Sequence, residues 1–513
     1  MLKSEALISL IHSMSKPEKK AFHIASTTEG NAPNYTRLYN LIRKDRNITA
    51  DALRTKYVSL RIGASYDTTV KYLYKVLLNN MLDLRTEQDS YYSLFDKILK
   101  ARILFEKSLF EECFDLLHKV MASAKKLENY FALLIASRLE IEYLLALNFP
   151  NMDEKSLLNK QLRINEVLRI TQKINQQSSL YELLKHRVIY KGNTRSEKQK
   201  MDLNDLVVSE MSIVASSNVQ NFEIKKLHQL FQANYLISVG DYKSALHSYY
   251  ELNTLLENNK HLWSNPPIYY VLTLEGILDS LRSRHHYEGM SYFTDQLKKL
   301  KTPSLNFNTN VKCLIFLYEL FPLLDRGDFA ASEKLMKSYS DELIKKSYLL
   351  SVARNAELSL YIALIHLGLR EYAKAQKTLT KIIFIGKSYS YLPLYRTIRL
   401  VNLLVLYELK DYDLIKYETR SIKRELNTDD KEYKIERFIL SFVNKQGMPV
   451  SGMKRDTLWI KISKEFEAFQ HDVFEQQILR IFDFSVWVES KVRKVSMPEI
   501  MKSKREEISE PHH

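Results

Sequence analysis

The sequence predicts an all-α protein built as a solenoid of stacked helix pairs. Six aromatic residues mark it, each just after a polar or glycine-containing break between two apolar stretches: Phe110, Tyr242, Tyr287, Phe329, Tyr372 and Tyr412. From Tyr242 onwards the spacings are 45, 42, 43 and 40 residues, and the gap from Phe110 to Tyr242 is 132, or three times 44. A period of this length is typical of repeated helix–turn–helix units that stack on their neighbours.

Two further columns of residues accompany these aromatics at helical spacing. Six positions earlier the chain has Leu104, Leu236, Leu281, Leu323, His366 and Leu406. Ten positions later it has Val120, Leu252, Leu297, Tyr339, Ile382 and Ile422. Because mainly apolar positions recur on both sides of each break, we expect each aromatic to stand beside a turn between two helices. We also expect Tyr242, Tyr287 and Tyr372 to be largely buried there.

The composition agrees with a large helical protein. The 513 residues are 45% hydrophobic but include only 11 Gly and 11 Pro, too few turn-forming residues for a many-stranded fold of this length. No Gly- or Ser-rich run divides the chain. We expect an N-terminal helical domain at 1–90, the solenoid at 91–445, and C-terminal capping helices with a basic tail at 446–513.

The best-preserved break reads Gly240-Asp241-Tyr242-Lys243-Ser244-Ala245-Leu246. It resembles the middle of a tetratricopeptide repeat, in which Gly forms the turn, an aromatic follows two residues later, and a small residue lets the helices approach. The resemblance implies a right-handed superhelical solenoid of antiparallel helix pairs. The period of about 40–45 residues is longer than the 34 of that family, and about eight pairs would fit between 91 and 440, with degenerate units between Tyr130 and Asn221.

The same resemblance implies where a partner would bind. In tetratricopeptide repeats the first helix of each pair lines a concave groove, and the matching positions here hold Arg102, Asn234, Asp279 and Arg282. Asn234 is the preferred contact, because its amide both donates to and accepts from the backbone of an extended peptide. The aromatic-rich stretch 478–488 is interpreted as a cap on the final repeat, with a detachable segment that competes with a partner as the alternative.

The N-terminal domain contains three helix-start signals. Ser15 and Glu18 have capping-box spacing, so a helix should begin near residue 16. Another is expected to start after Thr49, and Asp67 is expected to be the N-cap of a third. The third helix would bury the face that carries Val70, Leu73, Leu77, Met81 and Leu84.

The opposite side of that third helix carries Lys71, Lys75 and Asn79 at four-residue spacing. Basic and amide side chains on an exposed helix face suit the major groove of DNA. An ordinary solvated face is the favoured interpretation, because the break before Asp67 is longer than the compact turn of a helix-turn-helix.

No sequence pattern indicates catalysis or the binding of a cofactor. Residues 447–455 approach a phosphate-binding loop, but Met453 separates the second Gly from Lys454, and Arg455 replaces the required hydroxyl. His285 and His286 are expected in a solvated turn. His366 stands in an apolar column, where a buried imidazole bonded to a neighbouring helix is the common case. We therefore expect no enzyme, no cofactor and no metal site.

Charge and cysteine usage bear on location and partners. The formal net charge of +15 is spread along the chain, which favours a solvated basic surface over a nucleic-acid site. Cys113 and Cys313 are far apart in apolar positions, so we expect reduced thiols and a cytoplasmic location. No apolar run reaches the length of a transmembrane helix, so no membrane insertion is expected.

These observations favour a non-catalytic, cytoplasmic scaffold that binds a protein or a peptide. The alternative is a nucleic-acid-associated regulator that uses residues 1–90 to bind DNA or RNA and the solenoid for sensing or assembly. The partner's identity and the oligomeric state do not follow from these patterns.

Overall fold

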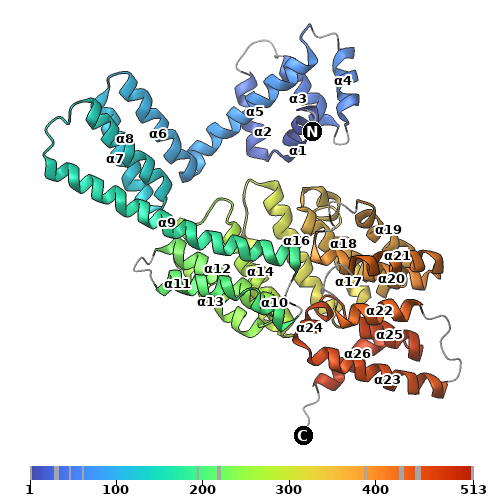
Figure 1. The fold of residues 1–513 in the computed structure, drawn as a ribbon. Helices are drawn as coiled ribbons and strands as arrows, with labels where there is room; N and C mark the ends of the chain where they lie inside the picture. The colour runs from blue at the N-terminus through green and yellow to red at the C-terminus, as the bar shows by residue number, and fades with distance from the viewer. Residues whose placement is uncertain are drawn as a thin grey trace. The chain divides into compact units, whose positions relative to one another are not determined.

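The computed structural model describes the chain except residues 1–2, 28–33, 46–47, 61–62, 193, 195, 216–220, 386–388, 390, 427–432, 445–451 and 510–513. Residues 447–451 of the phosphate-loop-like pattern lie outside the described residues. Every regular element in the described part is a helix, which confirms the all-α prediction (Figure 1). Helices that are neighbours in sequence pack on one another through most of the chain, as in a helical repeat protein.

The chain forms two compact units. The first comprises Met1–Asn175, Lys260–Pro267 and Lys301–Asn308, and the second comprises Gln176–Asn259, Ile268–Leu300 and Thr309–His513. The division falls within α9 (Glu154–Lys191) and α16 (Leu305–Leu324).

The first unit also holds α1 (Lys3–Ser13), α2 (Lys16–Thr27), α3 (Asn34–Lys44), α4 (Ala50–Ser59), α5 (Tyr66–Gln88), α6 (Ser90–Glu106), α7 (Phe110–Lys126), α8 (Tyr130–Ala146) and η1 (Lys260–Leu262). The second unit also holds α10 (Glu197–Met201), α11 (Asn204–Ala215), α12 (Phe222–Ser238), α13 (Tyr242–Asn258), α14 (Ile268–Ser283), η2 (Tyr287–Gly289), α15 (Met290–Lys299), α17 (Phe329–Ser338), η3 (Ile344–Leu349), α18 (Val352–Gly368), α19 (Tyr372–Ile385), α20 (Pro393–Glu408), α21 (Tyr412–Leu426), α22 (Lys434–Asn444), α23 (Gly452–His471), α24 (Val473–Leu479), α25 (Phe484–Arg493) and α26 (Met497–Ser509).

Helices α1 to α5 pack around the first hydrophobic core. Its fully buried members include Leu7, Leu38, Leu53 and Leu73, one from each of four helices. Burial of these leucines, at about 1.5–3 kcal/mol each, holds together helices that are too short to be stable alone.

The helix starts predicted in this region are largely correct. The Ser15 amide donates to Glu18 Oε2 at 2.7 Å, as a capping box requires, and α2 begins at Lys16. The Thr49 hydroxyl accepts from the Ala52 amide at 3.3 Å and caps α4. The N-cap of α5 is Ser65, so the prediction of Asp67 was wrong by two residues, and Asp67 lies in the first turn.

The six marker aromatics all stand at helix starts, because the same turn precedes each of them. Two residues before each aromatic is a residue with positive φ: Ser108, Gly240, His285, Gly327, Arg370 and Lys410. The amide just before each aromatic donates to the carbonyl of the residue five positions back, as from Asp241 to Leu236 at 2.9 Å. That carbonyl belongs to the column six residues before the aromatic. The repeat is thus a row of left-handed C-caps that close one helix and start the next.

Burial of the marker aromatics varies along the row. Phe329 is 5% exposed, and a Cβ added to Gly368 would lie 2.1 Å from its ring. Tyr242, Tyr287 and Tyr372 are partly buried, less deeply than Phe329. Each stands at the first position after a turn, where neighbouring helices cover only part of the ring.

The interval between Tyr130 and Asn221 departs from the predicted repeat. It contains α8, the 38-residue helix α9, and the short helices α10 and α11. The 132-residue gap therefore does not reflect three equal helix pairs. Because α9 runs unbroken, the turn pattern that marks the other repeats does not occur within it.

The C-terminal segment, residues 472–509, contacts more than the final helix pair. Val473 lies against the turn at Gly240, where an added Cβ would be 2.8 Å from Val473 Cγ1. Trp487, fully buried, donates from Nε1 to Glu408 Oε1 at 2.8 Å. Helices α24 and α25 thus contact the turn after α12 and the end of α20, which are far apart in the sequence.

The described helices include none that combines the length and the apolar character needed to cross a lipid bilayer.

Candidate functional site

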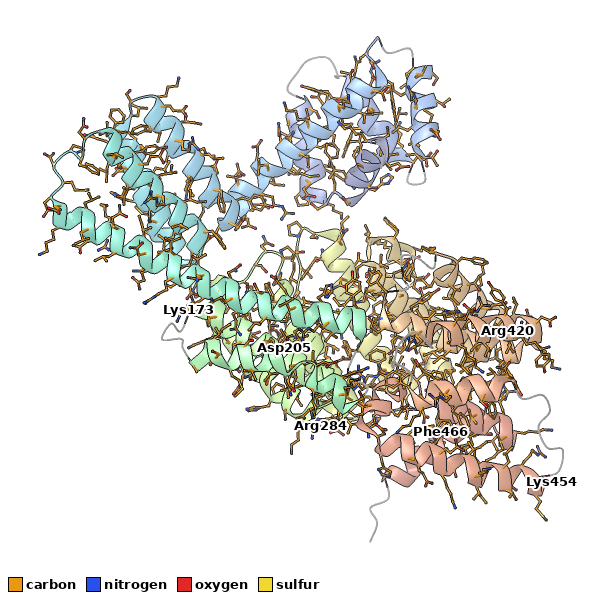
Figure 2. All side chains as sticks on the ribbon, viewed as in Figure 1. Lys173, Asp205, Arg284, Arg420, Lys454 and Phe466 are labelled. Carbon is orange, nitrogen blue, oxygen red and sulfur yellow. The ribbon has the colours of Figure 1, made fainter. Side chains whose placement is uncertain are left out.

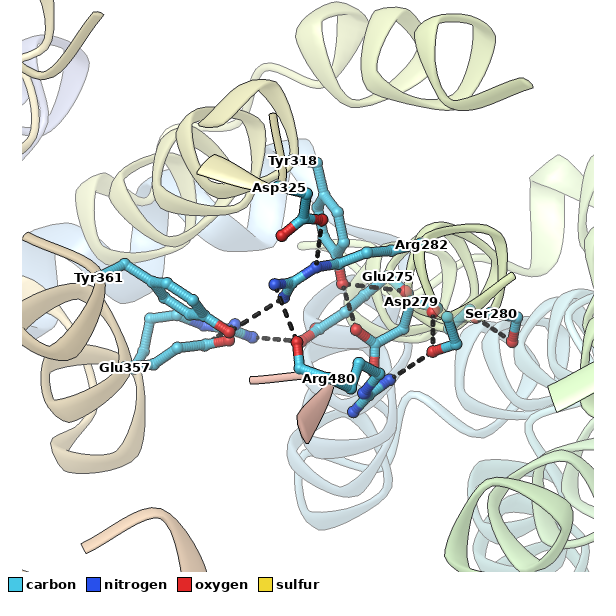
Figure 3. Close-up of polar contacts among 12 residues, drawn as sticks. Glu275, Asp279, Ser280, Arg282, Tyr318, Asp325, Glu357, Tyr361 and Arg480 are labelled. Carbon is cyan, nitrogen blue, oxygen red and sulfur yellow. Dashed lines mark hydrogen bonds and ion pairs between the residues drawn. The ribbon is translucent and has the colours of Figure 1, made fainter. Parts of the chain in front are cut away.

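Helix α14 carries three charged residues on one side of the helix. Glu275, Asp279 and Arg282 are four and three residues apart, so they project from the same side of the helix. They meet side chains from α16 and α18 and from the C-terminal segment, which together form a polar network (Figure 3).

Arg282 lies at the centre of this network and is 5% exposed. Its Nη1 donates to Tyr361 Oη at 3.0 Å, and its Nε lies 3.7 Å from Asp325 Oδ2. The guanidinium carbon also lies 3.5 Å from the centre of the Phe321 ring, a close cation–π contact. Burial opposes the charge of Arg282, but Tyr361 and Asp325 outweigh it and raise the pKa of the guanidinium above its ordinary value.

Arg354 of α18 ties that helix to α14. Its Nη2 donates to Glu275 Oε1 at 2.6 Å, and its Nη1 donates to Glu357 Oε2 at 2.5 Å. Burial raises the pKa of Glu357 and the nearby Glu275 adds to this effect, while Arg354 opposes it. The ion pairs therefore join two carboxylates that would otherwise repel each other.

Arg480 closes the network from the C-terminal segment. Its Nη1 donates to Asp279 Oδ2 at 3.2 Å and to Ser283 Oγ at 2.8 Å. Its backbone carbonyl accepts a hydrogen bond from Arg282 Nη2 at 3.1 Å. Its guanidinium also lies 5.0 Å from the centre of the Tyr242 ring. One residue of the C-terminal segment thus bonds to α14 through both its side chain and its backbone.

The chemistry of the network is that of a structural cluster. Its three arginines face four carboxylates at bonding distance, so most of the charge is compensated internally. Burial, with the charges of Asp279 and Glu275, raises the pKa of Tyr318 well above its ordinary value, so its hydroxyl stays protonated and donates to Asp279 Oδ1 at 3.3 Å. Among the described residues no cluster of side chains suits a metal ion. These contacts hold α14, α16, α18 and the C-terminal segment together.

The structure gathers two of the four predicted partner contacts into the network, Asp279 and Arg282. Asn234 of α12 is engaged elsewhere: its Oδ1 accepts from Lys185 Nζ at 3.0 Å, and its Nδ2 donates to the Leu230 carbonyl at 2.8 Å. Burial lowers the pKa of Lys185. The fourth predicted contact, Arg102, is exposed on α6 in the first unit.

The structure places Lys71, Lys75 and Asn79 on α5, and all three side chains are exposed. They lie on the side of the helix opposite the buried Leu73 and Leu77. These three residues therefore form a solvent-facing row on the first unit, which we call the α5 stripe.

The singled-out histidines have local roles. His366 is buried, but its Nδ1 pairs at 2.7 Å with Glu371 Oε2, in the turn that follows its own helix, and not with a neighbouring helix as expected. Lys374 and then His366 lower the pKa of the Glu371 carboxyl. His285 and His286 are exposed in the turn after α14, as expected.

An exposed apolar surface on α6 and α8 was missed by sequence reasoning. We call it the α6–α8 face; its large apolar members are Leu99, Ile103, Phe131, Ile135 and Leu145. The two helices contact each other, with the rings of Phe105 and Tyr143 stacked at 3.9 Å. The available signal was the spacing of Phe131, Ile135 and Leu145, which share a side of α8 other than that of the buried Ala132 and Ala136.

The exposure of the α6–α8 face is large for apolar side chains. Leu99 and Phe131 are each 61% exposed, and Ile103 is 55% exposed. Arg102 lies between Leu99 and Ile103 in the sequence. Burial raises the pKa of Tyr143 above its ordinary value, Arg102 opposes this effect and Glu142 adds to it. The face is therefore apolar with charged groups among and beside its apolar residues.

Comparison of the chain with models of known protein families finds no match, and comparison with curated proteins finds none either. The functional interpretation therefore rests on the side chains themselves.

Proposed function

We propose that the chain is a non-catalytic scaffold that binds a protein or peptide partner through the first helices of its helix pairs. In this proposal the pairs are antiparallel and wind into a right-handed superhelix, as the resemblance to tetratricopeptide repeats implies. The protein acts in the cytoplasm, where its buried free thiols, Cys113 and Cys313, stay reduced.

The exposed α6–α8 face is the observation that carries this proposal. Contiguous apolar surface is unfavourable in water, and larger exposed patches commonly mark sites of interaction. Two helices side by side, with apolar residues one turn apart, present a surface suited to a helix or an extended peptide. Arg102 adds a side chain of the kind enriched at protein interfaces.

The other predicted contacts are less accessible to a partner. Asn234 is bonded to Lys185, and Asp279 and Arg282 are bonded to Arg480. A partner at these positions would have to replace bonds already made within the second unit. The proposal therefore gives the α6–α8 face, with Arg102, the primary role.

Site-specific photocrosslinking in cells tests this proposal. A photoreactive phenylalanine analogue is placed at Leu99, at Phe131, and at the control position Val58 of α4, which is also 61% exposed. We expect the same protein to be crosslinked from Leu99 and Phe131 but not from Val58. Capture of nothing, or of the same set from all three positions, would count against the proposal.

A second candidate function is supported by the α5 stripe. Lys71, Lys75 and Asn79 are exposed together, and the chain carries a net charge of +15. In this alternative the first unit binds DNA or RNA through α5, and the solenoid senses or assembles. Two cations provide few phosphate contacts, so we place this function second.

A further inference from the structure

Helix α21 presents a basic side to solvent. Its buried residues Ile415, Thr419 and Ile422 follow one another at intervals of four and three, so they share the side that faces the neighbouring helices. The other side carries five exposed residues, which we call the α21 stripe: Lys416, Tyr417, Arg420, Lys423 and Arg424. Figure 2 shows Arg420 of this stripe projecting from the helix into solvent.

Little negative charge compensates the α21 stripe. The structure describes two carboxylate side chains on this helix, and one of them, Glu418, is held by Arg399, whose Nε donates to Glu418 Oε1 at 2.5 Å. The other, Asp413, is exposed one turn before Tyr417. Among the described residues, none forms an ion pair with a cation of the stripe. The stripe therefore carries a net positive charge that attracts anions.

Helix α19 repeats this composition. It packs on α20, as α21 does, and its sequence contains no acidic residue. Its exposed side carries what we call the α19 stripe: Lys377, Lys381 and Phe384. Phe384 is 86% exposed, and Tyr417 of the α21 stripe is 70% exposed. On each helix an aromatic ring thus stands in solvent one turn from a cation, Lys381 on α19 and Arg420 on α21.

We infer that the α19 and α21 stripes bind a single-stranded nucleic acid. Cations that contact phosphates, together with exposed rings on which bases stack, are the features by which proteins hold single strands without regard to sequence. In this inference the lysines and arginines contact the phosphates, and Tyr417 and Phe384 stack on bases.

A single strand suits these stripes better than the other anionic partners do. The bases of a duplex are paired and stacked inside it, whereas those of a single strand are open to a protruding ring. An anionic lipid surface would be met by apolar side chains gathered on one face and cations on the other. Here Tyr417 lies among the cations of its own stripe, with Lys416 before it and Arg420 one turn later.

Fluorescence anisotropy of the full-length protein tests this inference. The probes are labelled oligouridine of about 15 nucleotides, oligothymidine of the same length, and a duplex of that length. Sedimentation with vesicles that contain phosphatidylserine tests the lipid alternative. The variants are Arg420→Glu and Tyr417→Ala. Their controls are Arg169→Glu, at an exposed position of α9, and Tyr348→Ala, where the side chain is 65% exposed.

We expect either single strand to saturate the protein at moderate salt and to bind more tightly than the duplex. Arg420→Glu and Tyr417→Ala should each weaken that binding at least fivefold, while both controls bind as the wild type does and all four variants keep native helicity. Arg420→Glu should also lower the log–log salt slope by about 0.7, the value for one phosphate contact on a single strand.

The inference is overturned if neither single strand saturates, if the duplex binds equally well, or if the vesicles bind in place of the oligonucleotides. Losses in the two stripe variants no larger than those in their controls would overturn it as well. The result is independent of the scaffold proposal, because none of these residues belongs to the α6–α8 face and the titration needs no protein partner.

Discussion

Arg480 and Asp279 are separated by 201 residues, yet their side chains meet at 3.2 Å. This contact, with the hydrogen bond from Arg282 to the Arg480 carbonyl, ties the C-terminal segment to α14. The C-terminal segment is therefore packed into the second unit and does not only follow its last helix pair.

Replacing Arg480 with alanine should destabilise the second unit by about 1–3 kcal/mol. The change leaves Asp279 and Ser283 without their charged donor, and both are partly buried. The free energy of unfolding, from urea denaturation followed by tryptophan fluorescence, measures the effect. Arg284→Ala, at an exposed position next to the network, is the control and should change it by less than about 0.5 kcal/mol. Equal effects of the two changes would contradict the role of Arg480.

The marker aromatics should differ in their contribution to stability. Phe329→Ala should cost about 3–5 kcal/mol, because the ring is 5% exposed and fills the space beside Gly368. Tyr412→Ala should cost less than about 1 kcal/mol, because that ring is 42% exposed. Thermal denaturation of both variants gives the comparison. Similar losses at the two positions would show that burial does not explain the aromatic column.

Glu475 should make stability depend on pH. Its carboxylate accepts the backbone amides of Lys434 and Ile435, but burial raises its pKa above the ordinary value of 4.5. Between 4.5 and the raised pKa the folded state keeps a proton that the unfolded state has lost, so the contribution of Glu475 to stability falls as pH rises.

The comparison of the wild type with Glu475→Gln isolates this effect. Unfolding free energies are measured by urea denaturation at intervals from pH 4 to pH 7. The stability of the wild type relative to the variant should decrease upward from pH 4.5. A relative stability that increases with pH would mean that the hydrogen bonds outweigh burial.

Nucleic-acid binding through α5 should be weak. If Lys71 and Lys75 contacted phosphates, binding to duplex DNA would fall with salt with a log–log slope of about 0.9 per contact. We expect weak affinity at moderate salt that Lys71→Glu with Lys75→Glu leaves unchanged, with helicity intact. Tight binding that these two changes abolish would place the regulator function first.

Turn positions could be predicted because their signal is local. The positive-φ residue, the aromatic two residues later and the carbonyl acceptor six residues before the aromatic all lie within one short stretch. Gly occupies only two of these six turn positions, Gly240 and Gly327, so the aromatic was the better marker. Charged or polar residues at the other four turns adopt the same conformation at a cost of about 1–2 kcal/mol each.

The network was not predicted from the sequence, although two of its members were singled out as partner contacts. Asp279 and Arg282 were selected from their place in the repeat, but Arg354 and Arg480 come from other helices. No periodic pattern records which distant side chain compensates a charge, because that depends on how the helices pack. The unbroken α9 was also missed: the sequence suggested degenerate helix pairs between Tyr130 and Asn221, whereas α9 runs through 38 residues.

Affinity for the partner captured by crosslinking is the most direct measure of the scaffold function. Purified full-length protein is titrated with that partner, and the variants are Ile103→Asp and Phe131→Asp, with Val58→Asp as the matched exposed control. The account predicts that each change on the α6–α8 face weakens binding at least tenfold, or about 1.4 kcal/mol, while the control binds as the wild type does and all three keep native helicity. Unchanged affinity in both Ile103→Asp and Phe131→Asp would contradict it.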